Sequence, residues 1–261
     1  DIFVNASLQN AGTGGVHLIA GWDGIANAPG APGASPTATV VTAADFVPAA
    51  YGNGDGSVFI GNAAQTSAVR VGSRGGATTV AGHGLSVSGS TSTAGAASQL
   101  GFFANGAGAM TGDLALSLKA GGLTVAGGTT DSYAQIGHGG AGSTNGAAIS
   151  GAISVNFSAP GTVNVNGGSG LRAYGQIGHG GRSYTGTKFS GDISVINSGT
   201  VSILGGGNGD AYAQIGHGGR SATAGTLNDG IADFSGAINV TTVNGGDLFV
   251  RGTQLTGQAV A

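Results

Sequence analysis

The sequence contains no cysteine and no glutamate, and only 7% of its 261 residues are charged. Without cysteine the chain can form neither a disulfide nor a thiolate metal site. Its eight lysines and arginines are scattered along the chain, so the basic clusters that nucleic-acid binding requires are missing. No apolar run approaches the ~18 residues of a membrane-spanning helix, and we therefore expect no membrane insertion of this segment.

Glycine is abundant instead, with 57 residues, and one octapeptide recurs. The sequence YAQIGHGG stands at Tyr133–Gly140, and it returns at Tyr174–Gly181 (as YGQIGHGG) and at Tyr212–Gly219. Earlier segments that end in an apolar residue and Gly are read as weaker copies. The resulting anchor glycines are spaced by 36 to 41 residues at Gly21, Gly61, Gly101, Gly137, Gly178 and Gly216. About six repeats of ~39 residues account for nearly all of the chain.

Each full repeat contains three short runs in which apolar and polar residues alternate. The first run is Ile153-Ser154-Val155, the second is Val163-Asn164-Val165, and the third is the Tyr-Ala-Gln-Ile run. Such alternation is typical of a strand with one buried face. Equivalent strands that recur at a fixed period stack as parallel sheets. The sequence therefore predicts an all-β fold, a parallel β-helix (β-solenoid) with three short strands per coil, and we favour one coil per repeat over two shorter coils.

The repeats predict one β-solenoid segment over residues 1–261. Residues 26–36 contain three prolines and are typical of a loop that projects from the rod. The segments after each third run vary in length, and we expect loops on one side. Asp1–Val4 matches the second run at Asp247–Val250, so we expect a segment cut from a longer repetitive protein at both ends.

The histidines of the recurring motif, His138, His179 and His217, occupy one repeat position. One coil per repeat would stack them at the strand spacing of about 4.8 Å. Rings that close could share a divalent metal ion, or they could form a stacked corner that needs no cofactor. We favour the stacked corner, because planar groups also occupy this position in earlier copies. The residues at this position in the earlier copies are Trp22, Asn62 and Phe102.

The tyrosines and glutamines of the motif are candidates for ligand binding. Alanine and isoleucine take the inner face of the third run, so tyrosine and glutamine are predicted to point outward. An exposed aromatic row could stack on the sugar rings of a glycan. Alternatively the row packs under the following loop, with the amides hydrogen-bonded along the rod, and we favour this alternative. The candidates are Tyr133, Tyr174, Tyr212, Gln135, Gln176 and Gln214.

Two carboxylates raise the question of catalysis. Asp113 and Asp192 precede first runs at one repeat position, and two coils would separate them by about 9.6 Å. Inverting glycosidases hold their carboxylates ~6.5–9.5 Å apart, but aspartate before a strand is also a common turn residue. We predict that the chain is not an enzyme and assign no catalytic residue. A polysaccharide-binding or polysaccharide-degrading β-helix is the least favoured alternative.

Several of these motifs resemble a known family. Leu18–Gly24 (LIAGWDG), the three IGHGG copies and runs such as Gly161–Val165 (GTVNV) are similar to the filamentous-haemagglutinin type of bacterial exoprotein. These very large repetitive adhesins are exported by two-partner secretion or as autotransporter passengers. The resemblance covers most of the chain and implies a right-handed β-helix shaft.

Function and location follow from this resemblance as expectations. It implies a non-enzymatic shaft of an adhesin or surface filament, located outside the cell or at the bacterial cell surface. Its partner would be a glycan or another cell-surface ligand. The alternative is an extracellular fibre subunit that associates end to end with further copies of itself.

Overall fold

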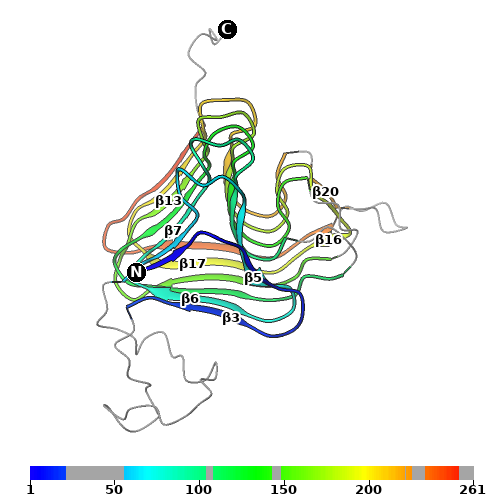
Figure 1. Cartoon of the computed structure of the whole chain (residues 1–261). Coiled ribbons are helices and arrows are strands. Elements are labelled where there is room, and N and C mark those ends of the chain that lie inside the picture. The colour runs from blue at the N-terminus through cyan, green and yellow to red at the C-terminus, as the bar shows by residue number, and fades with distance from the viewer. Residues whose placement is uncertain (22–55, 104–107, 143–147, 221, 225–232, 253–261) are drawn as a thin grey trace.

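Strands and turns make up the described chain in the computed structural model, which covers residues 1–21, 56–103, 108–142, 148–220, 222–224 and 233–252. The strands form three parallel sheets that enclose a triangular core (Figure 1). Valine, isoleucine and leucine alternate with serine, threonine and asparagine, which suits a pleated strand with one buried face. No helix within the described ranges is long and apolar enough to cross a membrane.

The three sheets are the walls of the coil, named here after the sequence run that forms them. The first wall consists of β3 (Val16–Ile19), β6 (Thr78–Gly82), β9 (Leu114–Leu118), β12 (Ile153–Phe157), β17 (Ile193–Ser198) and β22 (Ile238–Thr242). The second wall consists of β1 (Ile2–Val4), β4 (Val58–Ile60), β7 (Leu85–Ser88), β10 (Leu123–Ala126), β13 (Val163–Asn166), β18 (Val201–Leu204) and β23 (Leu248–Arg251). The third wall consists of β2 (Leu8–Asn10), β5 (Val69–Ser73), β8 (Ser98–Leu100), β11 (Ala134–Ile136), β14 (Gly175–Ile177) and β19 (Ala213–Ile215).

The chain visits the second, third and first walls in turn and then returns to the second wall one strand further along. Six such coils, followed by β23, are present in the described residues. In Figure 1 the N-terminal coil lies nearest the viewer and the chain runs clockwise as it recedes, which makes the coil right-handed. The predicted three-stranded parallel β-helix with one coil per repeat is therefore confirmed.

The core of the rod is a set of aliphatic stacks. Ile136 pairs in register with Ile177, which pairs with Ile215. The first two side chains are fully buried and the third, in the last complete coil, is partly buried. Each coil thus buries its apolar residues against those of the coils before and after it, and stability is a sum over neighbouring coils.

The register corrects the two earliest copies of the repeat. Ile60 pairs with Val87 in the second wall, and Ile19 pairs with Ala81 in the first wall, so neither belongs to the third wall. The residue in register with Leu100 of β8 is Val71 of β5, 29 positions earlier. The third-wall strands of the first two coils are therefore β2 and β5. Leu8 of β2 lies 63 positions before its partner Val71, so the first repeat is longer than predicted and the second is shorter.

A side lobe, present from the third coil onward, explains why the second coil is shorter than the later coils. The second coil passes directly from Ser73 at the end of β5 to Thr78 at the start of β6. From the third coil onward the chain leaves the rod between the third and first walls and returns, as Figure 1 shows to the right of the walls. Described parts of the lobe lie between Phe102 and Gly112, His138 and Gly151, His179 and Gly191, and His217 and Gly236.

The side lobe has its own sheets and its own core. Its strands pair from coil to coil, β15 (Thr185–Gly186) with β20 (Thr223–Ala224) and β16 (Lys188–Phe189) with β21 (Asp233–Phe234). A second hydrophobic cluster, separate from that of the rod, consists of Phe102, Met110, Ile149, Tyr184 and Phe189. The segments predicted as loops on one side of the rod are therefore a packed second column. The proline-rich segment 26–36 and Trp22 lie outside the described residues.

Candidate functional site: the tyrosine, glutamine and histidine ladders

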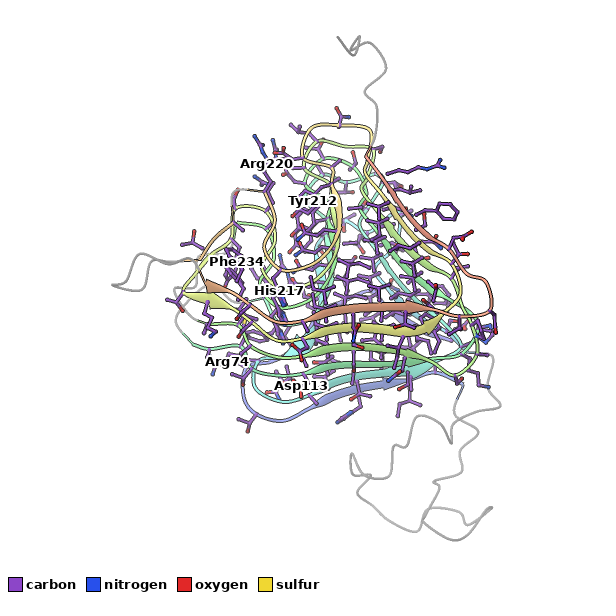
Figure 2. All side chains as sticks on the ribbon, turned by 180° about the vertical axis from the view of Figure 1, so that it is seen from behind. Arg74, Asp113, Tyr212, His217, Arg220 and Phe234 are labelled. Atoms are coloured by element: carbon purple, nitrogen blue, oxygen red, sulfur yellow. The ribbon has the colours of Figure 1, made fainter. Side chains whose placement is uncertain are left out.

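The third wall is covered on both faces. Its inner face lies on the core of the rod, and the side lobe folds back over its outer face. Tyr133 is 4% exposed and Tyr174 is fully buried, while Tyr212, in the last coil of the wall, is partly buried on the side facing the lobe (Figure 2). The prediction that this row points away from the core is correct, but an exposed aromatic ladder for sugar stacking is wrong because the lobe covers it.

The tyrosine rings form a continuous stack. Centroids of neighbouring rings are 4.8 Å apart with an interplanar angle of 2°, both between Tyr133 and Tyr174 and between Tyr174 and Tyr212. The hydroxyl of Tyr174 donates to Oε1 of Gln135 in the preceding coil over 3.3 Å. Burial raises the pKa of Tyr174 well above its usual value. These contacts match the alternative in which the row packs beneath the lobe.

The glutamines link successive coils through side-chain hydrogen bonds. Gln135 is fully buried, and its Nε2 donates to the carbonyl oxygens of Gly178 and Gly180 in the next coil, each over 2.9 Å. Its Oε1 accepts the hydroxyl of Tyr174 from that same coil. Both ends of the amide therefore bind the following coil. Equivalent donations to the next coil are made by Gln99 and Gln176, whereas Gln214 donates to His217 of its own turn.

The histidine rings also stack, and both nitrogens of His179 are hydrogen-bonded. Ring centroids are 5.2 Å apart between His138 and His179, and 5.0 Å apart between His179 and His217. Nδ1 of His179 accepts the backbone N–H of His138 over 3.0 Å, so Nε2 must carry the proton in the neutral ring. That nitrogen donates to the carbonyl oxygen of Gly151 over 2.6 Å.

Each histidine closes the neck of the side lobe in the preceding coil. The lobe of the third coil leaves the rod at Phe102 and returns at Gly112. His138 of the fourth coil accepts the N–H of Phe102 over 2.9 Å and donates to the carbonyl of Gly112 over 2.7 Å. His179 and His217 make the same pair of bonds to the lobe necks of the fourth and fifth coils. This role was not predicted from the sequence, although the first histidine of the motif comes one coil after the first described lobe.

Burial keeps these rings neutral. Loss of solvent lowers the pKa of His138 to about 4, against smaller opposing effects of the Gly112 carbonyl and the Asp113 charge. Burial and the two neighbouring rings lower the pKa of His179 well below its usual value. Burial also lowers the pKa of His217. At neutral pH the histidine column is therefore an uncharged set of hydrogen-bonded clamps.

None of the ring nitrogens of the three histidines is available to bind a metal ion in this geometry. A metal would need a lone pair on one ring nitrogen, and each of the three rings donates from Nε2 and accepts at Nδ1. Across the described residues, no group of three or more His, Cys, Asp or Glu side chains is placed to hold a metal ion. The stacked corner is confirmed for the three histidines. Phe102 occupies the same repeat position, but its side chain packs in the core of the side lobe, and Asn62 follows β4 of the second wall.

The two aspartates have structural partners. Oδ1 of Asp113 accepts the backbone N–H of Ala152 over 2.8 Å, and Oδ1 of Asp192 accepts that of Ala237 over 2.8 Å. In each case the carboxylate caps the next coil immediately before a first-wall strand, which is the turn role weighed against catalysis. Asp113 lies at the edge of this wall (Figure 2).

A charged corner was not recognised from the sequence. Asp131, Arg172 and Asp210 occupy one column with φ of 59°, 61° and 60°, so charges of opposite sign alternate along the rod. The Arg172 guanidinium donates to both oxygens of Asp131, over 2.6 and 2.5 Å, and lowers the pKa of that carboxyl. Both side chains are about one-third exposed, so the pair contributes little to stability.

Contacts between successive coils account for the repeated motif. Tyrosine, glutamine and histidine each use their polar atoms on the neighbouring coil, and the glycines let the backbones approach. The motif therefore serves the stacking of coils. Comparisons of the chain with family models, with curated proteins and with solved structures find no match.

Proposed function

We propose that this chain is part of the shaft of an extracellular bacterial adhesin or surface filament, a non-enzymatic rod that holds binding elements away from the cell. The supporting observation is the use of the motif's polar side chains. Gln135 and His179 bind neighbouring coils, in addition to the backbone ladders of three walls. Such cross-linking serves stiffness along the rod, which a shaft requires.

The resemblance of the sequence to filamentous-haemagglutinin-type exoproteins agrees with this proposal. A chain of low charge with many repeated coils also suits a long extracellular rod, because each coil adds length without a new fold. An antibody raised against the folded chain should label intact cells that produce the protein. Labelling that appears only after the cells are lysed would contradict the surface location.

The shaft proposal also predicts a mechanical signature. Pulling from the two termini should detach the coils one at a time, because each contacts only its neighbours. From the third coil onward, a released repeat of 36 to 41 residues adds about 120–150 Å of extended chain. Atomic-force spectroscopy should therefore record a series of steps of that length. A single rupture that extends the whole chain at once would argue against independent coils.

A self-assembling fibre is the second candidate, supported by the described end coils. Inward-facing apolar side chains are about half-exposed there, namely Leu8 at 50%, Ile238 at 52% and Leu248 at 54%. A further coil stacked on either end would bury them. Sedimentation velocity over a range of concentrations decides the matter: growth of rods that a Leu248→Lys change abolishes would favour the fibre, and a constant monomer would favour the simple shaft.

A further inference from the structure

A short column of phenylalanines stands on the outer face of the second wall. Phe3 of β1 is in register with Phe59 of β4, and their rings stack with centroids 5.0 Å apart and an interplanar angle of 10°. Phe3 is 66% exposed. This exposed aromatic stack has no role in the core or in the side lobe.

The column ends abruptly at the next strand. Phe59 is in register with Ser86 of β7, and Ser86 with Thr124 of β10. No ring therefore continues the stack, and a groove of about 440 Å³ opens there between Phe59, Ser86, Ser88 and Gly127. This volume lies in the ~300–1,000 Å³ range of small-molecule sites.

The remaining lining is uncharged and combines serine, threonine and asparagine side chains with alanine and glycine. Oγ of Ser86 and Oγ of Ser88 are 3.0 Å apart and share one hydrogen bond, so each hydroxyl has further bonding capacity. Nδ2 of Asn62 donates one hydrogen to Oδ1 of Asn5 over 2.9 Å, which leaves its second amide hydrogen for another acceptor. No charged side chain is among the described residues that line the groove. The chemistry suits a neutral ligand rich in hydroxyls.

We propose that this groove binds a neutral saccharide, with one pyranose ring stacked on Phe59 in the place of the missing third ring. The strand spacing of about 4.8 Å sets that place at stacking distance from Phe59. The C–H face of a pyranose is weakly positive and meets the negative face of the aromatic ring. Ser86, Ser88 and Asn62 then bind the sugar hydroxyls. The proposal rests on the proposed adhesin function in that it names a ligand class for the shaft.

The experiment begins with a panel of immobilised neutral and acidic glycans and the whole chain. A neutral glycan that binds is then titrated as a free oligosaccharide by NMR, with amide shifts expected at Phe59, Ser86 and Ser88. Phe59→Leu removes the ring but keeps an apolar side chain, and should weaken binding at least about tenfold. Phe249→Leu is the matched control, because Phe249 lies in the same outward column at β23 and away from the groove.

A second variant fills the site without loosening the fold. Ser86→Phe would continue the aromatic column across the groove, so it should abolish binding while the melting temperature stays equal or rises. The proposal is overturned if no neutral glycan binds at millimolar concentration, if only acidic glycans or peptides bind, or if Ser86→Phe binds as tightly as the unaltered chain. Surface labelling without glycan binding would refute this site alone, and glycan binding without surface labelling would refute the adhesin assignment alone.

Discussion

Acid should loosen this protein through its buried histidine column. In the native state each ring must accept a backbone N–H at Nδ1, as His138 does from Phe102 and His179 from His138. A proton on Nδ1 would place two donors face to face and add a charge in a buried site. The native rings therefore resist protonation, whereas the histidines of the unfolded chain do not.

The size of the effect follows from the pKa of His138. That pKa is about 4 in the native state, against 6.5 for an ordinary histidine. Between these values the unfolded chain holds one more proton than the native chain, so the free energy of unfolding falls by about 1.4 kcal/mol for each pH unit of acidification. At pH 5 the loss for His138 is about 2 kcal/mol. His179 and His217, whose pKa values are also lowered, add to the loss in the same direction.

Equilibrium unfolding in urea at pH 7, 6 and 5 measures this loss. His138→Phe should lower stability at pH 7, because the lobe neck at Phe102 and Gly112 loses its partner, but it should reduce the fall between pH 7 and pH 5 by about 2 kcal/mol. Gln135→Met is the matched control. It removes a buried ladder contact without removing a titrating group, and should cost about 1–3 kcal/mol equally at each pH.

One result would refute the neutral clamp. If the unaltered chain and His138→Phe lose the same free energy between pH 7 and pH 5, the ring is not held neutral and the hydrogen-bond assignment fails. The carboxyl of Asp131 does not confuse the comparison. Its pKa is lowered by Arg172, so the stability from that pair is lost only as the pH falls through its lowered pKa, below the range of the assay.

Three further substitutions test the packing, each by urea unfolding at pH 7. Gly178→Ala should destabilise the chain by more than about 2 kcal/mol, because φ is 154° and a Cβ would press on the carbonyl of Gly216; a neutral effect would contradict the close approach of the coils. Ile177→Ala should cost about 2–5 kcal/mol through a cavity in the rod core, and a smaller cost would indicate that the stack collapses around the gap. Arg172→Ala should leave the urea midpoint nearly unchanged, and a clear fall in the midpoint would show that the corner ion pair is more than a surface contact.

The regular part of the fold could be read from the sequence because two periods coincide there. From Leu85 onward, the period-2 alternation marks each strand and the repeat marks its partner, so Leu123 is found opposite both Leu85 and Val163. Where one face of a strand is aliphatic, this alternation fixes the register of pairing, because a shift by one residue would expose every inner side chain.

The first two coils could not be read in the same way. An apolar residue followed by glycine occurs at the end of strands in more than one wall, as at Ile60 in the second wall and at Leu100 in the third. Without the histidine and glutamine of the motif beside it, an apolar residue followed by glycine does not indicate which wall its strand belongs to. The second coil is also shortened because it passes directly from β5 to β6, so a constant period leads to the wrong strand.

The burial of the candidate residues could not be predicted from the sequence either. Alternation correctly places Tyr174 and Gln176 opposite the inner Ile177, but alternation says nothing about what covers the outer face. The side lobe does so, and its core is assembled from residues such as Met110 and Phe189 that lie outside any strong strand pattern. The groove beside Phe59 was not predicted because the sequence placed Phe59 and Ile60 in a third run. Phe3 and Phe59 are neighbours only when Val58–Ile60 is assigned to the second wall.

The histidine clamp has a consequence for how such a rod can change its length. His179 is hydrogen-bonded to both ends of the lobe in the preceding coil. Loss of a lobe from one coil would therefore leave a histidine in the next coil without its hydrogen-bond partners. Insertion or deletion of a whole turn, by contrast, joins matching halves of the tyrosine, glutamine and histidine ladders. We therefore expect rods of this kind to differ in length by whole turns, with the aliphatic stacks of the core continuous across each added or removed turn.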